Sequence, residues 1–111
     1  MPGLTALEEA HTPELHIALQ DGFDHDTVVV RVNGQDVFNT PDVTTRLQLG
    51  VARAFVVDVP EGLTDLQIVL PLKNVSESLR LQVSKPLHVG LSVSRDSGVT
   101  HRLSSEPFGY L

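Results

Sequence analysis

From residue 14 onward, apolar and polar residues alternate along most of the chain. An alternation with a period of two is typical of strands that bury one face and leave the other in water. The apolar rows are separated by turn residues, and they occupy residues 15–19, 28–32, 36–38, 45–49, 55–59, 66–70, 79–83, 87–93 and 99–103. We therefore predict an all-β fold, an antiparallel β-sandwich of about eight short strands, immunoglobulin-like or jelly-roll-like.

The clearest local signal is a β-hairpin. Val28, Val30 and Val32 lead directly into Asn33 and Gly34, and a second short run comes after them around residues 36–38. Asn-Gly suits the left-handed backbone of a type I′ turn, whose twist matches that of two paired strands. The sequence Asn-Thr-Pro-Asp at residues 39–42 is expected to end the second strand.

Residues 1–13 differ from the rest of the chain. Thr5 and Glu8 have the spacing of a capping box, and Pro13 would stop a helix. This N-terminal arm therefore forms either one helical turn or a frayed segment. Residues 14–111 are expected to form a single domain, since they are enough for one core and too few for two.

Composition removes several classes of partner. The eight Lys and Arg residues are scattered singly, and the net charge is −6. Nucleic acid and anionic membranes both call for a clustered basic face, so we expect neither as a partner. Cysteine is absent, so the fold uses no disulfide. No signal peptide or apolar segment long enough to span a membrane is present, which predicts a cytoplasmic protein for the chain as written.

An acidic loop precedes the hairpin. Asp21, Asp24 and Asp26, with Gly22 at the bend, place three carboxylates within six residues. Calcium binds six to eight oxygens, so the loop could supply half of a calcium site. His25 could also join Asp24 and Asp26 in a zinc or nickel site. The alternative is a solvated turn, because Asp and Gly are ordinary turn residues.

The same region carries a resemblance to known proteins. The acidic residues 21–26, together with Val28, Val30, Val32 and Asn33-Gly34, resemble a pattern in bacterial accessory β-sandwich domains, both immunoglobulin-like and carbohydrate-binding modules. The resemblance covers about residues 21–37 and implies a β-sandwich fold more than any activity; the activity it would imply is calcium-assisted ligand binding. The chain has no Trp to stack on a sugar ring, and it lacks the Cys-Trp-Cys pattern of immunoglobulin domains.

The remaining polar residues give no catalytic motif. His16 and His88 lie on the polar phase of their strands, which predicts exposed side chains, whereas His101 shares the apolar phase and is expected to be half-buried. No zinc-binding histidine pair, nucleophile elbow or phosphate-binding loop is present. We therefore expect no enzymatic activity.

The C-terminus is the strongest candidate for a contact surface. Phe108 and Tyr110 either fold back as a lid over the open end of the sandwich or dock on a partner as aromatic anchors. Strand 87–93, with His88 and Ser92 on its outer face, is expected to offer an unprotected edge for strand pairing. These features predict a binding or assembly module that acts through a protein partner or self-association. The alternative is a calcium-assisted carbohydrate- or ligand-binding module that uses the acidic loop.

Overall fold

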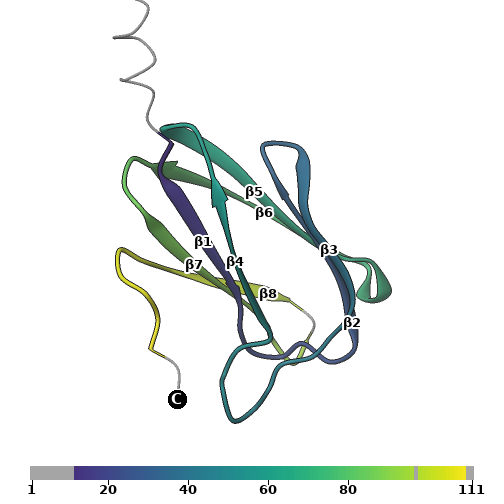
Figure 1. Ribbon diagram of the computed structural model, residues 1–111. Coiled ribbons are helices and arrows are strands. Elements are labelled where there is room, and N and C mark those ends of the chain that lie inside the picture. Colours follow the sequence, from purple (N-terminus) through teal and green to yellow (C-terminus); the bar gives the residue numbers. More distant parts are fainter. Residues whose placement is uncertain (1–11, 97, 110–111) are drawn as a thin grey trace, which may run out of the picture.

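The chain crosses between two sheets four times and forms a hairpin at three points along the way. A computed structural model describes residues 12–96 and 98–109; the predicted N-terminal arm therefore lies outside the described residues except for its last two. The strands are β1 (Glu14–Leu19), β2 (Asp26–Val32), β3 (Gln35–Val43), β4 (Arg53–Asp58), β5 (Gly62–Leu70), β6 (Val75–Val83), β7 (Leu87–Val93) and β8 (Val99–Ser104). They form two four-stranded sheets packed face to face (Figure 1). The predicted sandwich is confirmed.

One sheet has the strand order β4-β1-β7-β8, and the other has the order β3-β2-β5-β6. The hairpins are β2-β3, β5-β6 and β7-β8. All pairs are antiparallel except β1 and β7, which pair in parallel with Ile17 opposite Val89. The parallel pair was not predicted. It joins the first and seventh strands, and alternation within each strand carries no information on which distant strand lies beside it.

Most of the apolar rows predicted from the sequence build the core between the sheets. Leu15, Ile17 and Leu19 of β1 face Leu66, Ile68 and Leu70 of β5, and all six are at most 2% exposed. β5 ends at Leu70, and Pro71 begins a short 3-10 turn (Pro71–Lys73), as the proline predicts. Because successive side chains of a strand point to opposite faces, burying these rows turns the polar residues between them outward.

The Asn33-Gly34 turn forms as predicted, with φ angles of 51° and 83° that are both left-handed. The strand after it is longer than predicted, since β3 continues through Pro41 to Val43. Pro41 does not end β3, because β3 is an edge strand. Proline has no N–H to donate, and at the edge of a sheet no neighbouring strand needs that hydrogen bond.

The strand predicted at residues 45–49 is wrong. Residues 47–50 form a turn, in which the N–H groups of Leu49 and Gly50 both donate to the Arg46 carbonyl. The Leu47 side chain is 93% exposed, so the alternation at residues 45–49 does not bury an apolar face. Gly50 takes a left-handed φ of 73°, which suits a turn and not a strand.

Candidate functional site

The strands of the β4-β1-β7-β8 sheet turn alternate side chains away from the core, and these form what we call the outer face. In the register of the sheet, His16 of β1 lies beside Val56 of β4 and beside His88 of β7. The next outward row contains Ala54, Ala18 and Gly90, which are all small. The outer face therefore has a ridge of larger side chains beside a row of small ones.

Two histidines stack on the outer face. The rings of His16 and His88 lie 4.3 Å apart between centroids, with an angle of 24° between their planes. His16 Nε2 is 3.0 Å from Glu14 Oε1. Burial lowers the pKa of His88, and the positive charge of protonated His16 lowers it further. His88 therefore resists protonation in the folded protein. Both side chains are half-buried, where exposed ones were predicted, because each ring covers the other.

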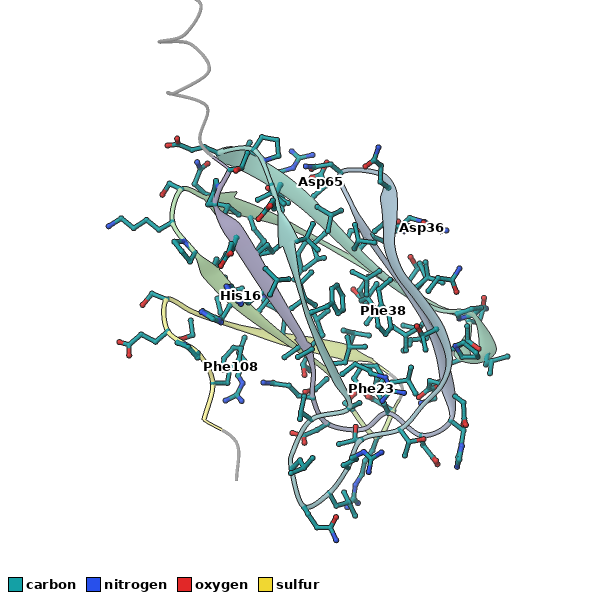
Figure 2. All side chains as sticks on the ribbon, viewed as in Figure 1. His16, Phe23, Asp36, Phe38, Asp65 and Phe108 are labelled. Atoms are coloured by element: carbon teal, nitrogen blue, oxygen red, sulfur yellow. The ribbon has the colours of Figure 1, made fainter. Side chains whose placement is uncertain are left out.

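Phe108 folds back onto this stack. Its ring meets the His88 ring edge-on, with centroids 6.3 Å apart, and the Arg102 guanidinium carbon lies 4.5 Å from the Phe108 ring centroid. Figure 2 places Phe108 and His16 on the same outward side of the molecule. The predicted lid over the open end of the sandwich is therefore wrong for Phe108, which covers the outer face instead. Tyr110 lies outside the described residues, so its predicted role as an anchor stays a prediction.

Arg102 links Phe108 to a buried polar side chain. The Arg102 Nε donates to Gln20 Oε1 at 3.1 Å, and Gln20 is only 3% exposed. Gln20 lies directly over Gly90, since a Cβ added at Gly90 would come within 2.3 Å of Gln20 Oε1. Gly90 therefore makes room for the Gln20 side chain, and Gln20 holds Arg102 against the Phe108 ring.

A shallow groove of about 300 Å³ opens beside these side chains. Ala18 and Ala54 supply its small residues, and Phe108 and the histidine pair also line it. Val56 of β4, which lies beside His16 and is 52% exposed, lines it too. The full lining is His16, Ile17, Ala18, Ala54, Phe55, Val56, His88, Pro107 and Phe108. Of these, the sequence had indicated only His88 and Phe108 as contact residues.

The prediction that strand 87–93 offers an unprotected edge is wrong. β7 lies between β1 and β8 and pairs with both, so it has no free edge. The sheet ends instead at β8 and at β4, which pairs with β1 alone. Ser92 points outward as predicted, and its hydroxyl oxygen accepts the Asp21 N–H at 3.2 Å. This bond holds the acidic loop against β7.

The acidic loop does not gather its carboxylates. Asp26 is 2% exposed, and its Oδ2 accepts the Lys73 ammonium at 3.0 Å and the Asp24 N–H at 2.9 Å. The Asp24 and Asp21 side chains lie at the surface. Within residues 12–96 and 98–109, no group of three His, Asp or Glu side chains is arranged to hold a metal ion. The calcium hypothesis stays a prediction, and unfolding temperatures in EDTA and in millimolar calcium check it.

His25 pairs with a residue that the sequence did not suggest. Its Nδ1 lies 2.5 Å from Asp42 Oδ1, and its Nε2 lies 3.7 Å from Asp24 Oδ1. The hydrogen bond to Asp42 raises the pKa of His25, and the negative charges of Asp42 and Asp24 raise it further. His25 and Asp42 precede Asp26 and Val43, which are opposite each other in the β2-β3 pair, so strand pairing brings them together. Both have left-handed backbones.

Three further polar residues, Ser94, Asp96 and His101, lie at the surface. His101, expected to be half-buried, is exposed, because it lies on the edge strand β8 where the sandwich opens. The Ser94 hydroxyl donates to Asp96, and this bond, together with the Gly98 N–H, lowers the pKa of Asp96. These are contacts within one turn.

Comparison with known proteins adds no family to this description: no protein-family model matches the chain, and no curated protein matches it significantly. No helix within the described residues is long and apolar enough to cross a membrane. The fold itself defines an eight-stranded β-sandwich domain.

Proposed function

We propose that this protein is a non-catalytic assembly module that associates with a second copy of itself through β4 and the adjoining groove. The observation that carries the proposal is the composition of this edge strand. Residues 54–57 of β4 are Ala, Phe, Val and Val, four consecutive uncharged residues on a strand with one unpaired edge. Arg53 and Asp58 lie at the two ends of β4, so the charge-free part of its unpaired edge is these four central residues. An uncharged stretch of unpaired edge is a template for pairing with another strand.

The other edge strands carry features that oppose such pairing. β3 contains Asp36, Pro41 and Asp42, and β8 contains His101 and Arg102. On β6, Glu77 occupies a position in the inward row. Charges, prolines and inward-pointing charged residues are the devices that protect sheet edges. β4 also has two charged residues, but Arg53 and Asp58 lie at its ends, whereas the other three edge strands carry theirs within the strand. Self-association through β4 is therefore more favourable than through any of the other three.

The groove extends the proposed interface beyond the backbone. Val56 projects from β4 onto the outer face, beside the histidine pair and Phe108. In an antiparallel pairing of two β4 strands, Val56 of one copy would lie opposite Val56 of the other, or close to it. Phe108 beside it adds an aromatic side chain, the kind that is enriched at the core of protein interfaces.

Sedimentation analysis over micromolar to millimolar concentrations tests the proposal. The wild-type protein is expected to form dimers as its concentration rises, and Val56→Lys is expected to remain monomeric because a lysine on the pairing edge opposes strand addition. Gln82→Lys is the matched control, since it adds the same charge to β6, the edge of the other sheet. A wild-type protein that is monomeric throughout, or a Gln82→Lys variant that loses dimers equally, would contradict the proposal.

A further inference from the structure

The two lateral edges of the sandwich, where one sheet ends opposite the other, are packed differently. Where β3 and β4 face each other, the rings of Phe38 and Phe55 stack with centroids 4.7 Å apart and planes at 7°. At the opposite side, between β6 and β8, a cavity of about 230 Å³ opens between the sheets. This cavity opens to solvent at the edge of the sandwich, since two of its lining residues, Glu77 and His101, are exposed. A small molecule can therefore enter it from outside.

The cavity is apolar inside and polar at its mouth. Its floor is formed by Leu66 and Ile68 of β5 and Leu91 of β7, which are all buried. Leu79 of β6 and Val99 of β8, both half-buried, form its sides. The two polar lining residues, Glu77 and His101, are both exposed.

These two polar residues stand where the pattern calls for apolar ones. In β6 the inward row is Val75, Glu77, Leu79, Leu81 and Val83, and in β8 it is Val99, His101 and Leu103. An inward charge discourages edge pairing, which accounts for Glu77 taken alone. It does not account for the cavity behind Glu77, nor for a histidine at the same opening. Apolar pockets with a few convergent polar groups are typical of sites for small molecules.

We propose that this cavity binds a small amphipathic amine, with its apolar group between the sheets and its ammonium group at the Glu77 carboxylate. A dry cavity of roughly 150 Å³ accommodates benzene, so about 230 Å³ accommodates a phenyl ring with a short chain. Glu77 is the carboxylate at the mouth, and the lining contains no Lys or Arg to compete with a ligand cation. The imidazole of His101 offers the ligand a second hydrogen bond.

A series of three probes of similar shape and different charge tests this assignment. We would titrate the protein with 2-phenylethylamine, 2-phenylethanol and phenylacetate, and follow the backbone amides by NMR. The amine is expected to bind most tightly, with a dissociation constant on the order of 1 mM or lower, and phenylacetate most weakly. The largest shifts are expected at Leu79, Leu91 and Val99, which line the cavity.

Two variants separate the charge from the cavity. Glu77→Gln is expected to weaken amine binding about fivefold or more, a loss typical of a charge-assisted hydrogen bond, and to leave 2-phenylethanol binding unchanged. Glu61→Gln, which removes the same charge from the exposed β4-β5 turn, is the matched control. Val99→Phe is expected to fill the cavity and prevent binding of all three probes.

Three results would overturn the proposal: no binding of the amine at concentrations on the order of 10 mM, equal binding of the amine and phenylacetate, or shifts centred on β3 and β4. If Val99→Phe does not fold, the comparison of Glu77→Gln with Glu61→Gln still decides the outcome, because equal amine binding by these two variants would also overturn the proposal. The β4 edge lies on the other side of the sandwich, so dimerisation and amine binding succeed or fail separately.

Discussion

Gly22 shows how a single residue fixes the position of a loop. It has a left-handed φ of 86°, and a Cβ added to it would lie 1.9 Å from the Val93 carbonyl oxygen. The neighbouring Asp21 carbonyl accepts the Val93 N–H at 2.8 Å. The acidic loop therefore rests directly on the end of β7, at a distance that only glycine permits.

We expect Gly22→Ala to lower the free energy of unfolding by about 3 kcal/mol or more, because it adds a clash with Val93 to the cost of a left-handed backbone. Gly34→Ala is the matched control, since Gly34 has a similar φ of 83° and nothing within 4 Å of its added Cβ. It should cost only about 1–2 kcal/mol. Urea unfolding of both variants measures the difference, and equal losses would contradict the clash.

Thr64 is a polar residue placed in the core. It is fully buried on β5, and its hydroxyl oxygen has no hydrogen-bond partner among the residues that the structure describes. We expect Thr64→Val to raise the free energy of unfolding by about 1 kcal/mol, because valine keeps the shape and removes the unsatisfied hydroxyl. Urea unfolding checks this, with Thr100→Val on the exposed face of β8 as the control. A loss of stability on Thr64→Val would contradict it.

At the scale of the element, the 3-10 turn after β5 is tied to the start of β2. Lys73 of the turn reaches the buried Asp26 carboxylate, which also accepts the Asp24 N–H. One carboxylate therefore positions both the acidic loop and the turn. A calcium ion at Asp26 would have to replace the lysine ammonium, because two cations cannot share this carboxylate at low cost.

Breaking this ion pair should be costly. We expect Asp26→Ala to lower the free energy of unfolding by about 2–4 kcal/mol, because the lysine and the loop N–H both lose a buried partner. Asp65→Ala is the control, since the Arg80–Asp65 pair is largely exposed and should contribute under about 1 kcal/mol. Chemical denaturation of both variants compares them. Similar losses would mean that burial of Asp26 adds nothing.

For the whole molecule, the two perturbed histidines give opposite dependences of stability on pH. The pKa of His25 is raised, chiefly by its hydrogen bond to Asp42. The stabilisation that this bond gives to the folded state is therefore complete below about pH 6.5 and is lost as pH rises through the raised pKa. The pKa of His88 is lowered, chiefly by burial. Its contribution to the free energy of unfolding is therefore present above about pH 6.5 and is lost as pH falls through the lowered pKa.

We therefore expect His25→Gln to cost more stability at about pH 5.5 than at about pH 8.5, and His88→Gln to cost more at about pH 8.5. Urea unfolding of the wild type and both variants at these pH values tests the two signs. His101→Gln, on the exposed edge of the sandwich, is the control. NMR titration of the wild type should give His25 the higher pKa of the two, and the reverse order would refute the assignment.

The sequence alone determined what depends on neighbours along the chain. Alternation in residues 15–19, 66–70 and 87–93 specified strands and their buried faces, and Asn33-Gly34 specified a turn, because both signals act within a few residues. The same logic failed at residues 45–49, where the alternation of Thr45, Leu47 and Leu49 met no partner strand. The alternation of apolar and polar residues predicts which face a strand would bury, but not whether another strand lies beside it to pair with.

Only the tertiary structure decided which strands lie side by side. The parallel pairing of β1 with β7 brings His16 to His88, and the return of the chain after β8 brings Phe108 to His88. Packing of β6 opposite β8 likewise brings Glu77 and His101 to one opening. These residues are far apart in the sequence, and each strand is locally compatible with several neighbours. The burial of most of the apolar rows at once selects one arrangement, and that choice places the candidate sites.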